Sequence, residues 1–367
     1  MDFTPSLVKK AAAVETPALL LDRRLVRRAY REIREAMPGV EILYAVKANP
    51  HSAVLDTLAK EGSGFELSST PELEAVLALG VGADHLISSN PIKSVDFIRR
   101  SMQAGLRTFA FDSRNEIEKL ARHSPGSRVY LRIVVDNTGS EWPLSKKFGV
   151  NSSEALDLFR AAADLGLQPY GLTFHVGSQC LNKNNWVNAL YLAGELWNVL
   201  ARHGISLSML SLGGGLPVKH TKPIPSYLEV GEGIAAALKE ALPPDIRLTM
   251  EPGRALVGEA AVLVTTVIGK ASRGLEEWLY TDVGVFNGLM ETVGGLKYEI
   301  RTERAAPPRT YTISGPSCDS FDVMFQGMEL PEVQVGDRLY IMNAGAYTLC
   351  YASSFNGFGP PGVHVIG

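Results

Sequence analysis

The side chains that could carry out chemistry lie at or near the ends of short apolar runs in this chain of 367 residues. These residues are Lys47, Glu66, His175, Gly213, Gly214, Gly215, Glu251 and Arg254. A lysine placed where an apolar run ends is usually solvated, so Lys47 in ILYAVKANP says little by itself. Gathered at one edge of a fold, however, these residues would supply an amine, a flat ring, carboxylates, bare backbone amides and a guanidinium.

Each of these features also has an ordinary structural interpretation. The triple glycine of MLSLGGG could form a flexible turn, His175 between Phe174 and Val176 could be a core histidine, and Glu251 in MEPGR could cap a turn. Glycine backbone N–H groups nevertheless cradle a phosphate well, and a nearby arginine strengthens that interpretation. A carboxylate can hold a protonated ring nitrogen, and a histidine can stack on a planar cofactor. The set therefore predicts a pocket for pyridoxal 5′-phosphate (PLP), with Lys47 as its Schiff-base amine.

The elements that must position these residues alternate between strand-like and helix-like runs. The strand-like runs cover residues 42–48, 64–69, 85–90, 107–112, 128–134, 170–176, 209–215 and 247–253. Stretches between them, such as SAVLDTLAKEG, TPELEAVLALG, SVDFIRRSMQAG and SSEALDLFRAAADLG, carry apolar residues at helical spacing. Eight successive β-then-α units predict a (β/α)8 barrel, in which chemistry collects at the carboxyl ends of the strands.

The sequence pattern changes after about residue 258. AAVLVTTVIGKA, EWLYTDVGVF, RTYTISG, DRLYIMN and GVHVIG are short β-rich runs separated by turns, with little helical periodicity. The opening segment also contains a strand-like run, TPALLLD, which we expect to pair with the C-terminal sheet. We therefore expect a barrel domain over residues 23–258 and a second, all-β domain formed by residues 1–22 and 259–367.

Composition limits the possible partners and the compartment. Lys and Arg total 36 and Asp and Glu 39, for a net charge of −3, and no basic run indicates nucleic-acid binding. No apolar stretch approaches the roughly 18 residues of a membrane span. The three cysteines, Cys180, Cys318 and Cys350, are widely spaced and predict no metal site. We expect a cytoplasmic protein that binds a small molecule and neither nucleic acid nor membrane.

Six motifs, in this order and spacing, resemble one family over nearly the whole chain. They are YAVKAN, FHVGS, GGG, EPGR, SGPSCDSFD, and NAGAY followed by FNGF. The sequence resembles the fold-type III, alanine-racemase-like, PLP-dependent decarboxylases of basic amino acids, and among them the ornithine decarboxylases. The resemblance implies an α/β TIM barrel that binds PLP, a C-terminal β-barrel domain, and a homodimer whose two active sites lie at the subunit interface.

The resemblance also implies a role for individual residues. Lys47 would bind PLP covalently, His175 would stack on the pyridine face, and Glu251 would keep the pyridine nitrogen protonated. The phosphate would be held by Ser178, Gly213, Gly214, Gly215, Arg254 and Tyr347, with Gly253 and Glu66 among the further cofactor contacts. The family keeps acidic residues near the cofactor at the positions of Glu66 and Glu72. From the partner subunit, Cys318 would return a proton to Cα, Asp319 would bind the distal ammonium of the substrate, and Phe355 would wall the site.

The tripeptide CDS at 318–320 bears most directly on the substrate. Diaminopimelate decarboxylases resemble this chain too, but they usually carry Cys-Glu-Ser there, whereas an aspartate suits a bare terminal ammonium, as in ornithine or lysine. PLP-dependent racemases of this fold place an arginine at the pyridine nitrogen, which argues against a racemase. Retention of Lys47, Glu251 and Cys318 argues against a non-catalytic regulatory homologue. The sequence thus predicts decarboxylation of L-ornithine to putrescine, with lysine as an alternative or additional substrate.

Three positions depart from the family pattern, the mildest being Glu66 in GFELSS, where the family carries an aspartate. In the animal enzymes an arginine precedes the Leu-Ser-x-Lys-Phe-Gly segment, whereas WPLSKKFG has Pro143 there. The animal enzymes also have a second acidic contact to the amine, and the nearest acid here is Glu291 in VFNGLMET. Glu291 is therefore a candidate contact to the substrate.

Overall fold

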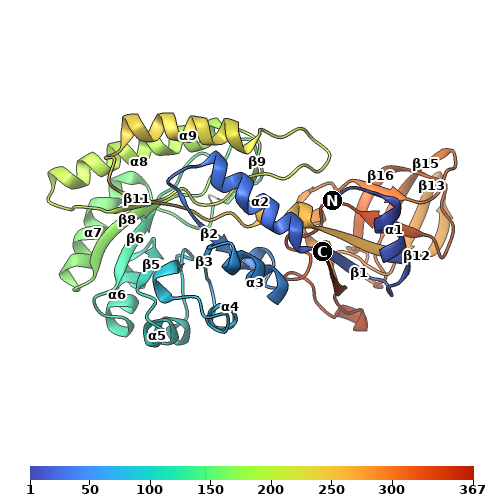
Figure 1. Ribbon diagram of the computed structural model, residues 1–367, viewed down its shortest axis with the longest axis horizontal. Coiled ribbons are helices and arrows are strands. Elements are labelled where there is room, and N and C mark those ends of the chain that lie inside the picture. The colour runs from blue at the N-terminus through green and yellow to red at the C-terminus, as the bar shows by residue number, and fades with distance from the viewer. Residues whose placement is uncertain (145) are drawn as a thin grey trace. The chain divides into compact units, whose positions relative to one another are not determined.

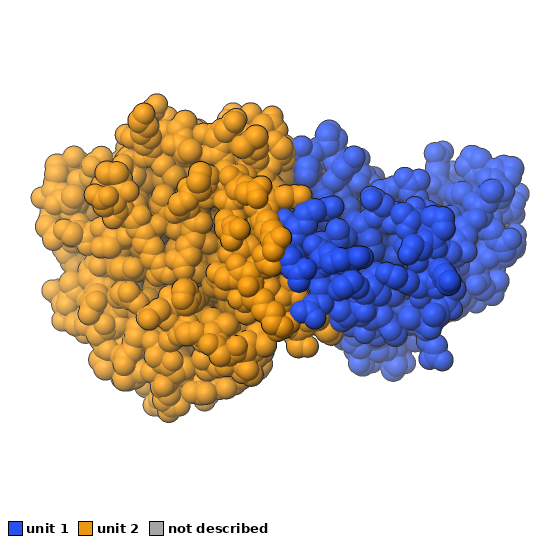
Figure 2. All heavy atoms as spheres, in the orientation of Figure 1, with its two compact units in different colours: residues 1–28, 218–224, 254–367 blue, residues 29–217, 225–253 orange. Residues whose placement is uncertain are grey.

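The computed structural model describes residues 1–144 and 146–367. They form two compact units, coloured separately in Figure 2: residues 29–217 with 225–253, and residues 1–28 with 218–224 and 254–367. We call the first the barrel unit and the second the β unit. The expected division placed residues 23–28, 218–224 and 254–258 with the barrel. Residues 218–224 belong to the β unit because the Lys219 carbonyl accepts a hydrogen bond from Asn343 Nδ2 at 2.7 Å.

Eight parallel strands form the sheet of the barrel unit, in the order β4-β3-β2-β11-β10-β8-β6-β5. Figure 1 labels several of them, including β2, β3 and β11. They are β2 (Glu41–Ala45), β3 (Gly64–Glu66), β4 (Leu86–Ile87), β5 (Thr108–Phe111), β6 (Arg128–Arg132), β8 (Gln168–Thr173), β10 (Met209–Ser211) and β11 (Arg247–Met250). The two ends of this order meet through Ser88, whose N–H donates to the Thr108 carbonyl at 3.1 Å and whose carbonyl accepts from Ala110 N–H at 2.7 Å. The predicted (β/α)8 barrel is therefore confirmed.

Helices follow the barrel strands, and three of them begin at a residue whose side chain caps a backbone N–H. They are α3 (Ser52–Lys60), α4 (Thr70–Leu77), α5 (Val95–Gln103), α6 (Arg114–His123), α7 (Ala155–Asp164), α8 (Asn184–Arg202) and α9 (Tyr227–Ala241), while α2 (Arg23–Ala36) precedes β2. The Ser94 hydroxyl, for example, accepts from Phe97 N–H at 3.1 Å at the start of α5, and Ser226 caps α9 in the same way. All four predicted helical stretches are present as α3, α4, α5 and α7.

The barrel strands are shorter than the apolar runs that predict them. β2 ends at Ala45, and the next residues, Val46–Ala48, form a 3-10 turn that carries Lys47. β10 likewise ends at Ser211, before the triple glycine. Lys47 and the triple glycine therefore lie on the turns that follow their strands. Inside the barrel, Leu43, Ile87, Ala110, Tyr130 and Met209 form one buried apolar cluster.

Eight strands also form the mixed sheet of the β unit, so the second, β-rich domain is confirmed. They are β1 (Ala18–Asp22), β12 (Ala261–Arg273), β13 (Glu276–Thr281), β14 (Ile300–Thr302), β15 (Pro308–Ser314), β16 (Val323–Pro331), β17 (Arg338–Ile341) and β18 (Gly362–Ile366). β1 pairs antiparallel with β12 and parallel with β18, as expected for the TPALLLD segment. A short helix, α10 (Arg254–Val257), precedes β12.

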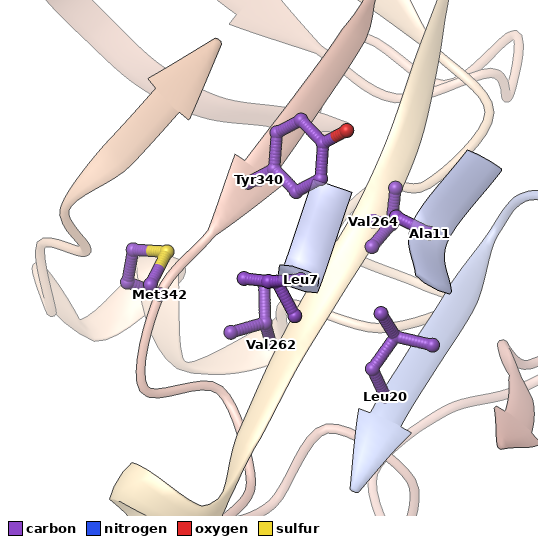
Figure 3. Packing of buried hydrophobic residues seen from close by; sticks show 7 residues of the cluster. All are labelled: Leu7, Ala11, Leu20, Val262, Val264, Tyr340 and Met342. Carbon is purple, nitrogen blue, oxygen red and sulfur yellow. The ribbon is translucent and has the colours of Figure 1, made fainter. Parts of the chain in front are cut away.

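Several elements were not predicted, among them β14, β16 and the two described next. Helix α1 (Pro5–Ala12) begins at Thr4, whose hydroxyl accepts from Leu7 N–H at 3.2 Å. Its Leu7 and Ala11, one turn apart, pack into a buried cluster with residues of β1, β12 and β17 and with Met342 (Figure 3). The second element is the antiparallel pair β7 (Ser140–Trp142) and β9 (Ser178–Cys180), which joins the loops after β6 and β8.

Candidate active site

Lys47 lies beside a buried carboxylate at the carboxyl end of the barrel. Its Nζ is 3.2 Å from Oε2 of Glu66, which lies at the end of β3 and is almost fully buried. The other oxygen of Glu66 accepts a hydrogen bond from Ser89 N–H at 3.2 Å. The turn that carries Lys47 is held in place because Ala45 N–H donates to the Pro252 carbonyl at 3.2 Å. A Cβ atom at Gly253 would lie only 2.9 Å from Ala48, so this approach requires glycine.

Glu251, which follows β11, is a second buried carboxylate at the same end of the barrel. Its Oε1 accepts hydrogen bonds from the hydroxyls of Ser89, at 2.7 Å, and Ser211. In the described part of the chain no donor contacts its Oε2. Burial raises the pKa of Glu251 above its ordinary value, and the neighbouring Glu66 carboxylate raises it further.

The two serines belong to a polar layer directly above the apolar cluster of the barrel. Because side chains alternate along a strand, a residue two positions after an inward-facing one also faces inward. Ile87 and Met209 belong to the apolar cluster, and Ser89 and Ser211 follow each of them by two residues. Arg132 follows Tyr130 in the same way. Sequence reasoning missed these residues, although this spacing would have found them once the inward face was known.

His175 is half-buried and lies against the triple glycine. Its Nδ1 accepts from Gly177 N–H at 3.0 Å, and its carbonyl accepts from Asn137 Nδ2 at 2.9 Å. Burial, together with the positive charges of Arg132 and Lys47, holds the pKa of His175 well below its usual range. The ring is therefore a neutral imidazole near physiological pH.

The triple glycine passes so close to its neighbours that side chains are excluded. A Cβ atom at Gly213, where φ is 63°, would lie 2.0 Å from the Phe174 carbonyl oxygen. A Cβ atom at Gly214 would lie 2.8 Å from the Glu251 carbonyl oxygen and 3.2 Å from Nε2 of His175. The N–H groups of Gly214 and Gly215 have no hydrogen-bond partner among residues 1–144 and 146–367. They are therefore available to a ligand.

Glu72, Ser178 and Pro143 lie in the barrel unit at a helix start, in strand β9 and just after strand β7. Glu72, in the first turn of α4, accepts from Ser68 N–H at 2.7 Å. Burial, and next the Glu66 carboxylate, raise the pKa of Glu72 to about 7. Ser178 begins β9 and pairs there with Trp142 of β7, next to Pro143.

Arg254 and Glu291 form a buried ion pair in the β unit. Arg254 Nη1 donates to Glu291 Oε2 at 2.9 Å, and Nη2 donates to the other oxygen, Oε1. Burial opposes the charge of Arg254, but Glu291 more than offsets this, so the pKa of Arg254 is raised. The guanidinium also lies 4.9 Å from the ring centre of Tyr347. Both oxygens of Glu291 are thus engaged by Arg254.

Cys318, Asp319 and Phe355 lie together on the surface of the β unit. Cys318 Sγ is 3.2 Å from Oδ1 of Asn356, the residue after Phe355. Asp319 shapes its own turn, because its Oδ1 accepts from Phe321 N–H at 2.8 Å. The Phe355 ring packs against Phe286 with 4.9 Å between ring centres.

Comparisons with known proteins match this architecture. The family described as "Pyridoxal-dependent decarboxylase, pyridoxal binding domain" matches residues 23–258. The chain is 36% identical to a lysine/ornithine decarboxylase of Selenomonas ruminantium, over 95% of this chain and 89% of that one. It is 33% identical to the ornithine decarboxylase of Mus musculus, over 90% and 76% of the two chains. A lysine/ornithine decarboxylase from Vibrio vulnificus, solved with putrescine, superposes with a TM-score of 0.90 at 32% identity, over 99% of this chain and 98% of that one.

The chain belongs to the pyridoxal-dependent decarboxylases. As a member of this family it uses PLP, and two features of the barrel unit suit that cofactor. The free N–H groups of Gly214 and Gly215 suit a phosphate, and the open oxygen of Glu251 suits a protonated ring nitrogen. Among the described residues no group of three or more His, Cys, Asp or Glu side chains could hold a metal ion. No helix in those same residues is both long and apolar enough to span a membrane.

Proposed function

We propose that this decarboxylase converts L-ornithine to putrescine and CO2. Asp319 carries this proposal, because its carboxylate is exposed in a defined turn beside Cys318 and suits a bare ammonium group. A relative with 36% identity is named as a lysine/ornithine decarboxylase, which supports lysine as an alternative or additional substrate. The two substrates differ by one methylene, which is worth only about 1 to 3 kcal/mol in a pocket.

The residues of the barrel unit would hold and tune the cofactor. When bound, PLP acts as an electron sink for the pair left on Cα as CO2 departs. We propose that Lys47 binds it covalently, that the neutral His175 ring stacks on its face, and that Glu251 holds its ring nitrogen in the protonated form. Glu66 would keep the Lys47 amine oriented through their 3.2 Å contact.

The phosphate would be bound by a further set of residues in this proposal. They are Ser178, Gly213, Gly214, Gly215, Arg254 and Tyr347, with Gly253 as a further contact to the cofactor. The Arg254 charge is stabilised by Glu291, so Glu291 supports the proposed phosphate contact instead of reaching the substrate as sequence analysis suggested. A bidentate partner also fixes the orientation of the guanidinium.

The substrate would be bound and protonated by residues of the β unit. We propose that Asp319 binds the distal ammonium, that Phe355 walls the site, and that the Cys318 thiol delivers a proton to Cα after CO2 has left. The family resemblance assigns these three residues to the partner subunit of a homodimer.

Turnover of four amino acids by the PLP-loaded enzyme tests the proposal. We expect ornithine to give the highest kcat/KM, lysine to follow, and arginine and diaminopimelate to be poor substrates. Asp319→Asn keeps an acceptor for Phe321 N–H but loses the negative charge. It therefore tests binding of the substrate ammonium without removing the hydrogen bond that shapes the turn. We expect it to lower kcat/KM for ornithine by about a hundredfold or more with PLP still bound, because leaving a desolvated charge unpaired costs about 3 to 5 kcal/mol. Equal turnover of ornithine by parent and variant would place the ammonium elsewhere.

A further inference from the structure

Ser89 contacts both buried carboxylates of the barrel unit at once. Its N–H donates to Glu66 Oε1 at 3.2 Å, and its hydroxyl donates to Glu251 Oε1 at 2.7 Å. It lies on the loop after β4, whereas the two carboxylates lie at the ends of β3 and β11. A single residue thus ties together three strands at the carboxyl end of the barrel.

The hydrogen bonds of the Ser89 hydroxyl all run from donor to acceptor in the direction of Glu251. A serine hydroxyl has one hydrogen, and here it points to Glu251. Tyr130 OH lies 2.6 Å from the same hydroxyl oxygen, so Tyr130 must donate to Ser89. Burial, and next the Glu251 charge, hold the pKa of Tyr130 well above its usual range, which keeps the phenol a donor. The result is a donor chain from Tyr130 through Ser89 to Glu251.

Ser211 supplies a second donor to the same oxygen. Its hydroxyl donates to Glu251 Oε1 and accepts from Gly213 N–H at 3.2 Å. A bond from the glycine amide therefore leaves the Ser211 hydrogen free to point at Glu251. Both hydroxyl donors act on Oε1 and none among the described residues acts on Oε2, so the carboxylate is held in one orientation.

We propose that Ser89 is a positioning residue, which with Ser211 directs Glu251 so that its Oε2 faces the ring nitrogen of the cofactor. This inference rests on the proposed role of Glu251. The remaining charges near Glu251 are Glu66, Lys47 and Arg132. Among the described residues none of these charged groups donates a hydrogen bond to the Glu251 carboxylate, so the hydroxyl donors decide its orientation.

The neighbouring residue offers a matched control. Ser88 is also fully buried, and its hydroxyl has no hydrogen-bond partner among residues 1–144 and 146–367. Ser88→Ala and Ser89→Ala therefore remove the same group from adjacent positions of one loop. Only the second removes a donor to Glu251.

The experiment measures two quantities on the PLP-loaded enzyme: the single-turnover rate of CO2 release and the dissociation constant of PLP by equilibrium dialysis. A hydrogen bond to a charged acceptor is worth about 1.5 to 3 kcal/mol, or roughly tenfold to a hundredfold in rate. We expect Ser89→Ala to slow CO2 release at least about tenfold and to weaken PLP binding severalfold. Ser88→Ala should change each quantity less than about twofold, and Ser89→Thr, which keeps a hydroxyl, should restore most of the loss.

A double-mutant cycle with Glu251→Ala separates this inference from the proposed function. If Ser89 acts through Glu251, adding Ser89→Ala to Glu251→Ala should change neither quantity more than about twofold. A full further loss in that background would mean that Ser89 acts through Glu66 or the loop, and would overturn the inference. Should Glu251→Ala alone leave both quantities unchanged, the proposed role of Glu251 would itself be wrong.

Tyr130→Phe keeps the experiment decisive if Ser89→Ala does not fold. It removes the hydroxyl that orients Ser89 and preserves the ring in the barrel core. We expect Tyr130→Phe to slow CO2 release in the parent enzyme. Added to Glu251→Ala, it should cause no further slowing. Parent-like rates in Tyr130→Phe would overturn the donor chain.

Discussion

At the scale of single residues, the carboxylates near Lys47 differ in how they are stabilised. Glu66 contacts the lysine directly, Glu251 receives two hydroxyl donors, and Glu72 receives a backbone N–H at the start of α4. Burial, and next the charge of Glu66, raise the pKa of both Glu72 and Glu251. The protonation of these two groups should therefore be visible in the stability of the protein.

Glu72 gives the clearest pH dependence. Its pKa is about 7 in the folded protein against an ordinary value of 4.5, so between these pH values the folded state binds more protons than the unfolded state. The free energy of unfolding should then fall as the pH rises through this window. The side chain of Glu72→Gln cannot titrate. The free energy of unfolding of this variant minus that of the parent should therefore rise by about 2 to 3 kcal/mol between pH 4.5 and pH 8, measured by urea unfolding.

A surface glutamate of the same helix serves as the control for Glu72. Glu74 pairs with Arg100, and this hydrogen bond holds its pKa below the ordinary value. Glu74→Gln should follow the parent over the same pH range. A parallel pH dependence of the parent and Glu72→Gln would show that Glu72 is ionised throughout.

The Arg254–Glu291 pair predicts a loss of stability. Both side chains are about 95% buried, and removal of one charge leaves the other without compensation. Glu291→Gln should lower the free energy of unfolding by about 3 to 5 kcal/mol, measured by urea denaturation of the PLP-free protein. Tyr298→Phe, which removes only a 3.5 Å contact to Glu291, should cost far less. Similar losses for the two variants would mean that the charge pair does not dominate this site.

At the scale of elements, the glycine turn after β10 links local backbone geometry to the site. Gly213 and Gly204 both have positive φ, 63° and 77°. A Cβ atom at Gly204 would meet nothing within 4 Å, whereas at Gly213 it would lie 2.0 Å from the Phe174 carbonyl oxygen. A comparison of these two glycines thus separates the cost of the positive φ from the cost of a steric clash at the added Cβ atom.

Alanine at these two glycines should have different effects. Gly204→Ala should cost about 1 to 2 kcal/mol of stability through φ alone and leave PLP binding unchanged. Gly213→Ala should cost more and weaken PLP binding at least about tenfold, because the turn must move away from His175 and Glu251. Thermal unfolding and dialysis against PLP measure both effects. Equal PLP affinity in the two variants would contradict a phosphate role for the turn.

How much of the fold the sequence predicts depends on whether the signal is local. The amphipathic stretches of α3, α4, α5 and α7 and the eight apolar runs are local signals, and they predict the barrel correctly. The pairing of β7 with β9 joins residues 140–142 to 178–180 and has no local pattern. Helix α1 is short, and its Leu7 and Ala11 become informative only against β1 and β12.

The candidate site, too, is only partly predictable from local sequence. Lys47, His175, Glu251 and the triple glycine stand in recognisable motifs, and the structure places all of them at the carboxyl end of the barrel. Ser89 and Ser211 are common residues whose roles depend on which strand face points inward. That face is known only once the closed barrel fixes the register of its strands.

At the scale of the whole molecule, exposed aromatic rings lie on the β unit near Cys318. Phe321, Phe355 and Phe358 are 54%, 40% and 38% exposed, although large aromatic side chains are usually buried. Phe321 and Phe355 both pack on Phe286, so two of the exposed rings form one patch. Contiguous exposed apolar surface marks an interaction site. We propose that a second copy of this chain, as the family resemblance implies, covers this patch.

Mixing two inactive variants tests whether the site is shared between subunits. Lys47→Ala lacks the cofactor amine, and Cys318→Ala lacks the proposed proton donor, so each homodimer should be nearly inactive. If the two residues act in one site from different subunits, random exchange of equal amounts gives about half mixed dimers, each with one intact site. Ornithine turnover should then recover to about a quarter of the parent value. Each variant taken alone through the same exchange is the control, and no recovery after mass spectrometry has shown mixed dimers would mean that Lys47 and Cys318 act within one chain.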